Sequence, residues 1–233
     1  LRFRWGGWYV TGTHGDEKHL GNIVVRDVAT LQELDKLRVY DLKMLDGLID
    51  VEQYPSATSD IVALLVLEHQ VHVQNLITRV NYDTRTALAA GGESISEETK
   101  SIIEASAESL VQAMLFSGEP LLASPIGGSN DFMASFERRG PMEGEGRSLR
   151  QFDLETRLFR YPLSYLVYSQ AFDALPDIIR SYVFRRLEEL LSAGQPDPLV
   201  VRLPAGERTA MLELLRETKP AFAAAAATAA NPR

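Results

Sequence analysis

The chain has 233 residues, of which 45% are hydrophobic and 24% charged, and its formal net charge at pH 7 is -8. This length and composition support an ordinary hydrophobic core, and we expect one helical domain over residues 1–220. The acidic balance excludes a basic surface that follows nucleic-acid phosphates, and the absence of cysteine excludes disulfides, zinc-thiolate sites, iron-sulfur ligation and thioether attachment of haem within these residues.

The first 25 residues are rich in glycine, tryptophan, threonine and histidine and show no sustained helical period, which predicts an ordered loop or short extended segment. The chain opens at Leu1 without methionine or an identifiable signal peptide, which predicts a processed product or a fragment. Of these we expect a fragment, the C-terminal part of a longer polypeptide. From Asp27 to about Tyr40 a three-residue apolar spacing predicts a first amphipathic helix. Its apolar positions are Val28, Leu31, Leu34 and Leu37.

The longest helix is predicted from Ile61 to about Ala89, a stretch without proline or glycine. Ser59 or Asp60 is a suitable N-terminal cap, and Gly91-Gly92 ends the pattern. The first two turns are apolar on all sides, which indicates a central, buried position. The longest aliphatic run covers only residues 61–67, and because a bilayer requires about 20 residues, no transmembrane helix is predicted.

A capping box formed by Ser94 and Glu97 predicts the start of the next helix, which should run to about Phe116. It should form an antiparallel hairpin with the long helix. Residues 118–152 are rich in glycine and proline and predict an irregular connection, with a short helical piece around residues 132–138.

The C-terminal third contains an aromatic segment, residues 159–168, and two further predicted helices. Pro176 suits the first position of a helix that ends at Gly194, and a short helix should follow over residues 205–218. The alanine-rich tail, residues 221–233, is expected to fray and remain flexible. Together these elements predict an all-α fold, a helical bundle with an irregular N-terminal segment and one long connection.

All four histidines lie in two short motifs, and the first spans residues 13–22. It places His14 and His19 on a glycine-containing loop that directly follows Trp5 and Trp8. Because imidazole ligates transition metals and haem iron, the motif could bind a metal or pack against a flat macrocycle. The alternative, of about equal weight, is that these histidines hydrogen-bond the loop to the body and the tryptophans fill the core.

The second motif contains Glu68, His69 and His72, in the middle of the long predicted helix. At 100° per residue, His69 projects from the apolar face and must find a partner. Glu68 and His72 stand one turn apart, so the carboxylate could orient the second ring as metal sites often require. A structural histidine explains His69 nearly as well.

Other catalytic patterns are absent from the sequence. A carboxylate-bridged di-iron bundle requires Glu-x-x-His, and no glutamate stands three residues before a histidine. There is also no His-Glu-x-x-His, Gly-x-Ser-x-Gly, Walker loop or dinucleotide-binding fingerprint.

Three long segments carry a resemblance to a family of uncharacterised bacterial proteins that contain a cytochrome c domain. They are residues 4–15 (RWGGWYVTGTHG) with 19–22 (HLGN), residues 59–70 (SDIVALLVLEHQ), and residues 156–162 (TRLFRYP) continuing to Tyr168. The resemblance implies export to the periplasm and a Cys-x-x-Cys-His haem attachment upstream of the Trp-Gly-Gly-Trp segment. This chain has no such attachment, and the family pattern has Cys where Leu163 stands and often His where Gln74 stands.

The leading hypothesis is therefore a periplasmic haem-associated domain. It would supply an axial histidine, or the wall of the haem pocket, for electron transfer or small-molecule redox chemistry, with haem provided by an upstream domain or a redox partner protein. His69 is the first expected ligand, followed by His14 and His19, and Trp5 and Trp8 would shield the macrocycle.

Two alternatives stay open, and so does the question of whether the chain is an enzyme. One is a non-catalytic structural or interaction subunit whose histidines are structural. The other is a non-haem metal-binding protein that uses His14, His19, His69 or His72.

Overall fold

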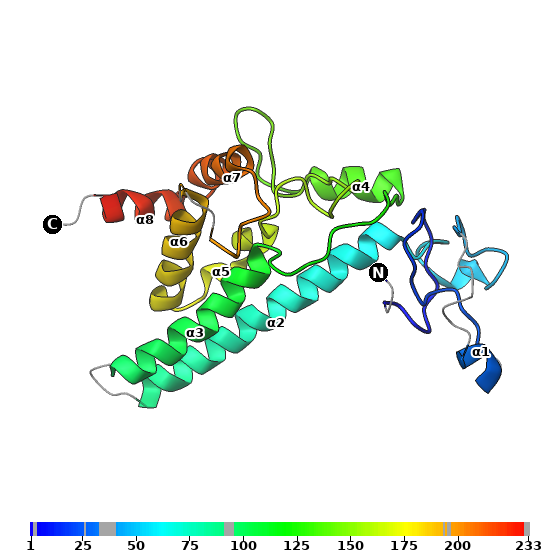
Figure 1. Cartoon of the computed structure of the whole chain (residues 1–233), viewed down its shortest axis with the longest axis horizontal. Helices are drawn as coiled ribbons and strands as arrows, with labels where there is room; N and C mark the ends of the chain where they lie inside the picture. The colour runs from blue at the N-terminus through cyan, green and yellow to red at the C-terminus, as the bar shows by residue number, and fades with distance from the viewer. Residues whose placement is uncertain are drawn as a thin grey trace. The chain divides into compact units, whose positions relative to one another are not determined.

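The computed structural model describes residues 1, 4–25, 27–32, 41–90, 96–192, 194 and 197–230. Over these residues the regular secondary structure is helical and no strand is formed, which confirms the all-α prediction (Figure 1). The chain divides into two compact units. The first unit contains residues 1–67, 120–136 and 152–158, and the second contains residues 68–119, 137–151 and 159–233. The expectation of a single domain over residues 1–220 stays a prediction.

The longest helix, α2, runs from Ile61 to Ala90 as predicted. Asp60 caps its first turn, because its Oδ1 accepts a hydrogen bond from the backbone N of Ala63 at 2.8 Å. By length and composition α2 could cross a membrane, but core helices of soluble proteins pass the same test and 39% of its apolar window is buried. The expected absence of a transmembrane helix therefore stays a prediction.

Irregular chain dominates the first unit, and its N-terminal loop is held by single backbone bridges to three distant segments. The pairs are Thr11 with Asp60, Gly12 with Leu42, and Thr13 with Gly127. Gly12 has φ +124°, and a Cβ there would collide with the carbonyl oxygen of Gly127. Only glycine fits this close backbone approach. The three bridges thus fix residues 11–13, directly before His14, against residues 42, 60 and 127.

Helical pieces in the first unit are short. They are α1 (Val28–Gln32), a 3-10 turn η2 (Val51–Gln53) and α4 (Asn130–Glu137). The last confirms the helical piece predicted within the irregular connection. The helix predicted from Asp27 to Tyr40 is present over the α1 residues, and residues 33–40 lie outside the part of the chain that the structure describes.

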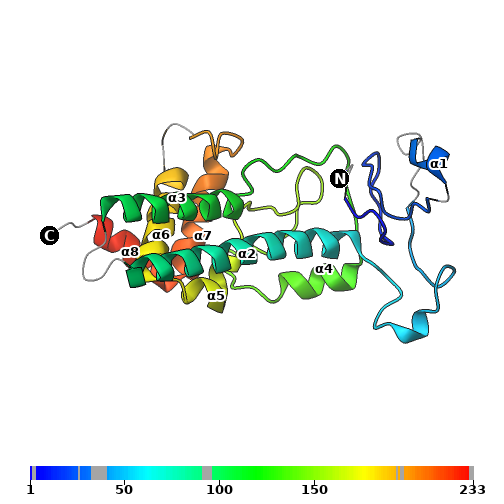
Figure 2. The same ribbon diagram turned by 90° about the horizontal axis from the view of Figure 1, so that it is seen from below.

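The second unit is the helical bundle. Besides the later part of α2 it contains α3 (Glu97–Met114), η3 (Tyr165–Tyr168), α5 (Gln170–Asp173), α6 (Asp177–Ser192), α7 (Ala205–Thr218) and α8 (Pro220–Ala230). In both views α3 runs antiparallel to α2, as the hairpin prediction required (Figures 1 and 2). Helix α6 lies against α3, α7 and α8. The cap of α3 is Ser96, whose side chain accepts from the backbone N of Thr99, rather than the predicted Ser94, which is outside the described residues.

The alanine-rich tail differs from the prediction, because it is helical from Pro220 to Ala230. Alanine has the highest intrinsic helix propensity, and proline suits the first helical position. Phe222 anchors the helix, since its side chain is 1% exposed and its ring meets that of Phe184 edge-on at 5.4 Å. Residues 231–233 lie outside the described part of the chain.

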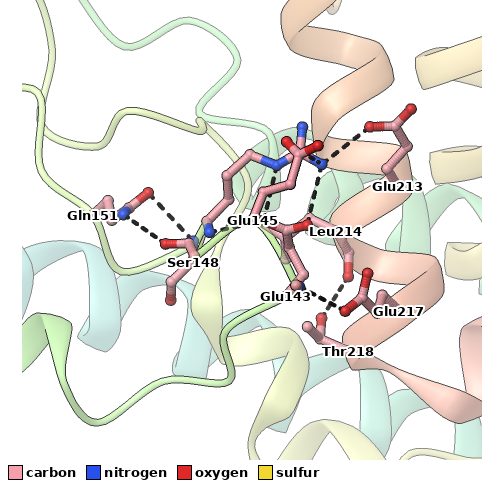
Figure 3. Close-up of polar contacts among 11 residues, drawn as sticks. Glu143, Glu145, Ser148, Gln151, Glu213, Leu214, Glu217 and Thr218 are labelled. Carbon is pink, nitrogen blue, oxygen red and sulfur yellow. Dashed lines mark hydrogen bonds and ion pairs between the residues drawn. The ribbon is translucent and has the colours of Figure 1, made fainter.

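Part of the glycine-rich connection is held against α7 by a charged cluster (Figure 3). The guanidinium of Arg147 donates to Glu143 at 3.0 Å and to Glu213 at 3.1 Å. The backbone N of Gly144 donates to Glu217 at 2.7 Å. Hydrogen bonding to Arg147 lowers the pKa of Glu143 to about 2, so this carboxylate stays ionised at neutral pH. This segment is irregular but well tethered.

Candidate functional site

The first histidine motif forms a compact group of rings in the first unit. His14 and His19 meet edge to face, with ring centroids 4.7 Å apart and an interplanar angle of 76°. Trp5 meets His19 edge-on at 5.5 Å. The backbone places these rings, because His14 follows the bridged Thr13 and the N–H of Leu20, next to His19, donates to the carbonyl of Arg4 at 2.9 Å.

These three rings are buried without hydrogen bonds. The exposed fractions are 5% for His14, 2% for His19 and 8% for Trp5. Within the described residues, no hydrogen-bond partner reaches either ring nitrogen of His14, either ring nitrogen of His19, or Nε1 of Trp5. A buried polar group without a partner costs about 1–3 kcal/mol, and such groups are rare in native proteins. Several buried polar atoms without a partner, gathered in one place, are typical of a site that binds a ligand.

His19 is in the protonation state that binds metals. Burial, and next the neighbouring His14, lower the pKa of His19 to about 4. The ring is neutral at pH 7, and a neutral imidazole has a lone pair on one nitrogen that can ligate a metal.

A glycine shapes the space around His19. A Cβ on Gly21 would lie 2.9 Å from Nδ1 of His19 and 2.5 Å from Cγ2 of Val10, so no side chain fits there. Asn22 fixes the same turn to Val10 through two hydrogen bonds of 2.7 Å, in which its side-chain amide accepts from the backbone N and donates to the carbonyl. These contacts give a structural reason for the His-Leu-Gly-Asn motif.

One carboxylate approaches the pair. Oδ1 of Asp41 accepts a hydrogen bond from the backbone N of His14 at 3.0 Å and lies 3.5 Å from Nε2 of the same ring. The second distance is short enough for an ion pair but does not meet hydrogen-bond geometry. Sequence reasoning missed Asp41 because 27 residues separate it from His14.

The part of the chain that the structure describes holds no group of three or more His, Cys, Asp or Glu side chains arranged for a metal ion. The pair can therefore supply at most two protein ligands from these residues. A zinc-type site usually takes three or four protein ligands, whereas haem iron takes four nitrogens from its macrocycle and needs only one or two axial ligands. A histidine pair in a low-polarity environment fits the second requirement better.

Trp8 does not belong to the buried group. Its side chain is 59% exposed, and that of the adjacent Tyr9 is 37% exposed. Trp5, in contrast, is buried beside the histidines. The shielding of a macrocycle by Trp5 and Trp8 stays a prediction.

His69, the first expected ligand, lies in the second unit in a different environment. Its Nε2 and Oγ of Ser164 are 2.8 Å apart, a hydrogen bond, and its ring stacks on Phe116 at 4.0 Å and 11°. The rings of Phe159 and Tyr165 stand 6.2 Å away. The residue is 5% exposed, and burial, followed by the charge of His72, lowers its pKa to about 3. These contacts favour the structural interpretation of His69.

The His69 and Ser164 pair is not arranged as a hydrolase dyad. Ser164 is 0% exposed, so a substrate has no access to its hydroxyl. Nδ1 of His69 has no hydrogen-bond partner, whereas a catalytic triad places a carboxylate there. The same hydroxyl also lies 3.3 Å from the backbone N of Leu166 and caps η3. The serine was missed from the sequence because 95 residues separate it from His69.

His72 is exposed on α2 and does not join either buried group. The four histidines thus fall into a buried pair in the first unit, and one buried and one exposed ring in the second. No protein-family model, curated protein or solved structure matches this chain.

Proposed function

We propose that this chain binds a transition-metal centre through the buried imidazoles of His14 and His19. The centre that we favour is haem iron, used for electron transfer or small-molecule redox chemistry in a periplasmic protein. One observation carries the proposal: four ring nitrogens and the adjacent indole N–H of Trp5 are buried together with no hydrogen-bond partner in the described residues.

The ring geometry bears on how a centre can be held. The ring centroids of His14 and His19 lie 4.7 Å apart, with the rings edge to face. The two rings are therefore close enough that either imidazole, or both, would hold one centre.

The remaining residues have supporting roles. Trp5 forms an apolar wall against His19, which excludes water and strengthens electrostatic interactions at the site. Gly21 and Asn22 hold the turn that carries His19. Bound haem would supply one-electron chemistry, and these residues would orient its ligand.

Binding experiments on the purified chain test the proposal. Haemin, and separately Zn²⁺ or Co²⁺, should bind at one equivalent, with a Soret shift in the first case and a metal stoichiometry in the second. His19→Ala should weaken binding at least about a hundred-fold, because even an outer partner of a metal ligand is worth 10- to 100-fold. His72→Ala is the matched control, since this histidine is exposed, and it should bind as the native chain does.

A second function is favoured by a separate observation. Trp8, Tyr9, Val24 and Val25 are exposed at 59%, 37%, 64% and 44%, respectively. Exposed apolar side chains of this size often mark interfaces, which is consistent with a non-catalytic interaction subunit. If the purified chain binds neither haemin nor a metal ion, the metal-centre proposal is overturned and this second function becomes the better one.

A further inference from the structure

We infer that Asp41 is a positioning residue that fixes the tautomer of His14, so that Nε2 carries the proton and Nδ1 is the nitrogen free for the centre. The inference rests on the proposed function for its purpose. Its structural content, the tautomer of His14, can be tested without any metal.

The first step is the position of the carboxylate. Asp41 directly precedes Leu42, whose carbonyl accepts a hydrogen bond from the backbone N of Gly12 at 2.8 Å. Oδ1 of Asp41 in turn accepts from the backbone N of His14 at 3.0 Å. Residues 41–42 thus bond both ends of the segment 12–14, through the Leu42 carbonyl at Gly12 and the Asp41 carboxylate at His14.

The second step is the contact with the ring. The same Oδ1 lies 3.5 Å from Nε2 of His14. A hydrogen bond from a ring N–H to a carboxylate is about 2.7–3.2 Å long, so a movement of less than about 1 Å closes it. An ionised carboxylate can only accept hydrogen bonds. It therefore favours the form in which Nε2 carries the hydrogen.

The third step is the consequence for the other nitrogen. A neutral imidazole has one protonated nitrogen and one with a lone pair. With the proton on Nε2, Nδ1 of His14 keeps its lone pair, and this atom is buried with no hydrogen-bond partner. A carboxylate opposite a ligating histidine is the arrangement by which proteins orient imidazole ligands and raise their basicity.

Charge supports the assignment. The side chain of Asp41 is 43% exposed and that of His14 only 7%. The carboxylate thus keeps contact with solvent while it lies against a ring in the interior. A pair buried on both sides would lose much more to desolvation.

Asp41→Asn separates orientation from folding. Asparagine retains an oxygen that can accept from the backbone N of His14, but its amide group can also donate to Nε2. The variant should therefore fold while it loses the preference for a proton on Nε2. Asp46→Asn is the matched control, because Asp46 is an exposed aspartate of the same segment.

The experiment uses ¹⁵N-labelled full-length chain without metal, at pH 7.5, and reads the tautomer of each imidazole from long-range ¹H–¹⁵N correlations. We expect His14 to carry its proton on Nε2 in the native chain and in Asp46→Asn, and to shift toward Nδ1 protonation in Asp41→Asn. Co²⁺ affinity should fall 10- to 100-fold in Asp41→Asn alone.

The outcomes separate the two proposals. A native His14 protonated on Nδ1, or an Asp41→Asn spectrum identical to the native one, overturns the role of Asp41 even if the chain binds a metal centre. If the tautomers behave as expected but neither Co²⁺ nor haemin binds, the orienting role of Asp41 stands and the proposed function falls.

Discussion

The histidines of the two units differ less in burial than in what their nitrogens contact. His14 and His19 in the first unit are 5% and 2% exposed, and His69 in the second is 5% exposed. His69 has a hydrogen bond to Ser164 and stacks on an aromatic ring, Phe116. The pair in the first unit has no hydrogen bond to any ring nitrogen within the described residues.

Burial of an imidazole is therefore weak evidence for function by itself. Burial lowers the pKa of both His19 and His69, to about 4 and about 3. Either ring is neutral at pH 7 and could ligate a metal on that criterion. Within the described residues, the distinguishing property is the number of unsatisfied polar atoms that lie together, which is five at His14, His19 and Trp5 and one, Nδ1, at His69.

The largest expected effect concerns acid stability. The folded-state pKa of His69, about 3, is below the ordinary value of 6.5. As the pH falls, His69 binds a proton in the unfolded chain before it does so in the folded chain. The stabilisation that the neutral ring contributes is therefore fully present above pH 6.5 and is lost as the pH falls from 6.5 to 3. The full loss from this ring is on the order of 5 kcal/mol.

Urea unfolding at pH 7.5, 5.5 and 4.5, for the native chain and for His69→Leu, measures this loss of unfolding free energy. The native chain should lose free energy of unfolding more steeply than the variant, by roughly 2–3 kcal/mol at pH 4.5. His72→Leu keeps His69 and its burial, which is the larger cause of the lowered pKa, and removes only the smaller contribution of His72. Its slope should therefore stay close to that of the native chain. Equal slopes for the native chain and His69→Leu would show that the ring does not resist protonation.

The next effect concerns the first unit. Gly21→Ala should destabilise the chain by about 2 kcal/mol, because the new Cβ overlaps Nδ1 of His19 and Cγ2 of Val10. It should also weaken haemin or metal binding, because His19 is displaced. Gly47→Ala is a suitable control, since a Cβ there meets nothing within 4 Å. A Gly21→Ala chain with native stability and native binding would mean that the turn does not position His19.

The comparison also shows which parts of the structure the sequence could predict. Helix α2 was predicted almost to the residue, because a stretch without proline or glycine follows a capping aspartate, Asp60. Helix α8 was missed, because an alanine-rich tail was interpreted as low complexity although alanine is the best helix former. Caps, helix breakers and helix propensities thus carry enough information to predict a helix whose bounds depend on neighbouring residues.

The site needed more than local rules. The motif with His14 and His19 was recognised, but whether the rings would meet depends on backbone bridges to distant segments such as Gly127. Asp41 and Ser164, which contact His14 and His69, are distant in sequence and belong to common residue types. Nothing in one sequence marks such a partner in advance. The hydrogen bond between Ser164 and His69 weakens the hypothesis that His69 is a ligand. That bond could not be predicted from the sequence.

The smallest expected effect tests whether the hydrogen bond of His69 matters for stability, since this bond is what distinguishes His69 from the buried pair in the first unit. Ser164→Ala removes the hydrogen-bond partner of Nε2 and the cap of η3, and should cost about 1 kcal/mol. Ser169→Ala, which removes the comparable cap of α5, controls for capping alone. If His69 depends on Ser164, the loss in Ser164→Ala should exceed that in Ser169→Ala when both are measured by urea unfolding at pH 7.5. A smaller loss in Ser164→Ala would mean that aromatic packing alone holds His69. Within the described residues the second unit already holds one buried nitrogen without a partner, Nδ1 of His69. If it also tolerated an unpaired Nε2 at little cost, the unpaired nitrogens of His14 and His19 would be less informative.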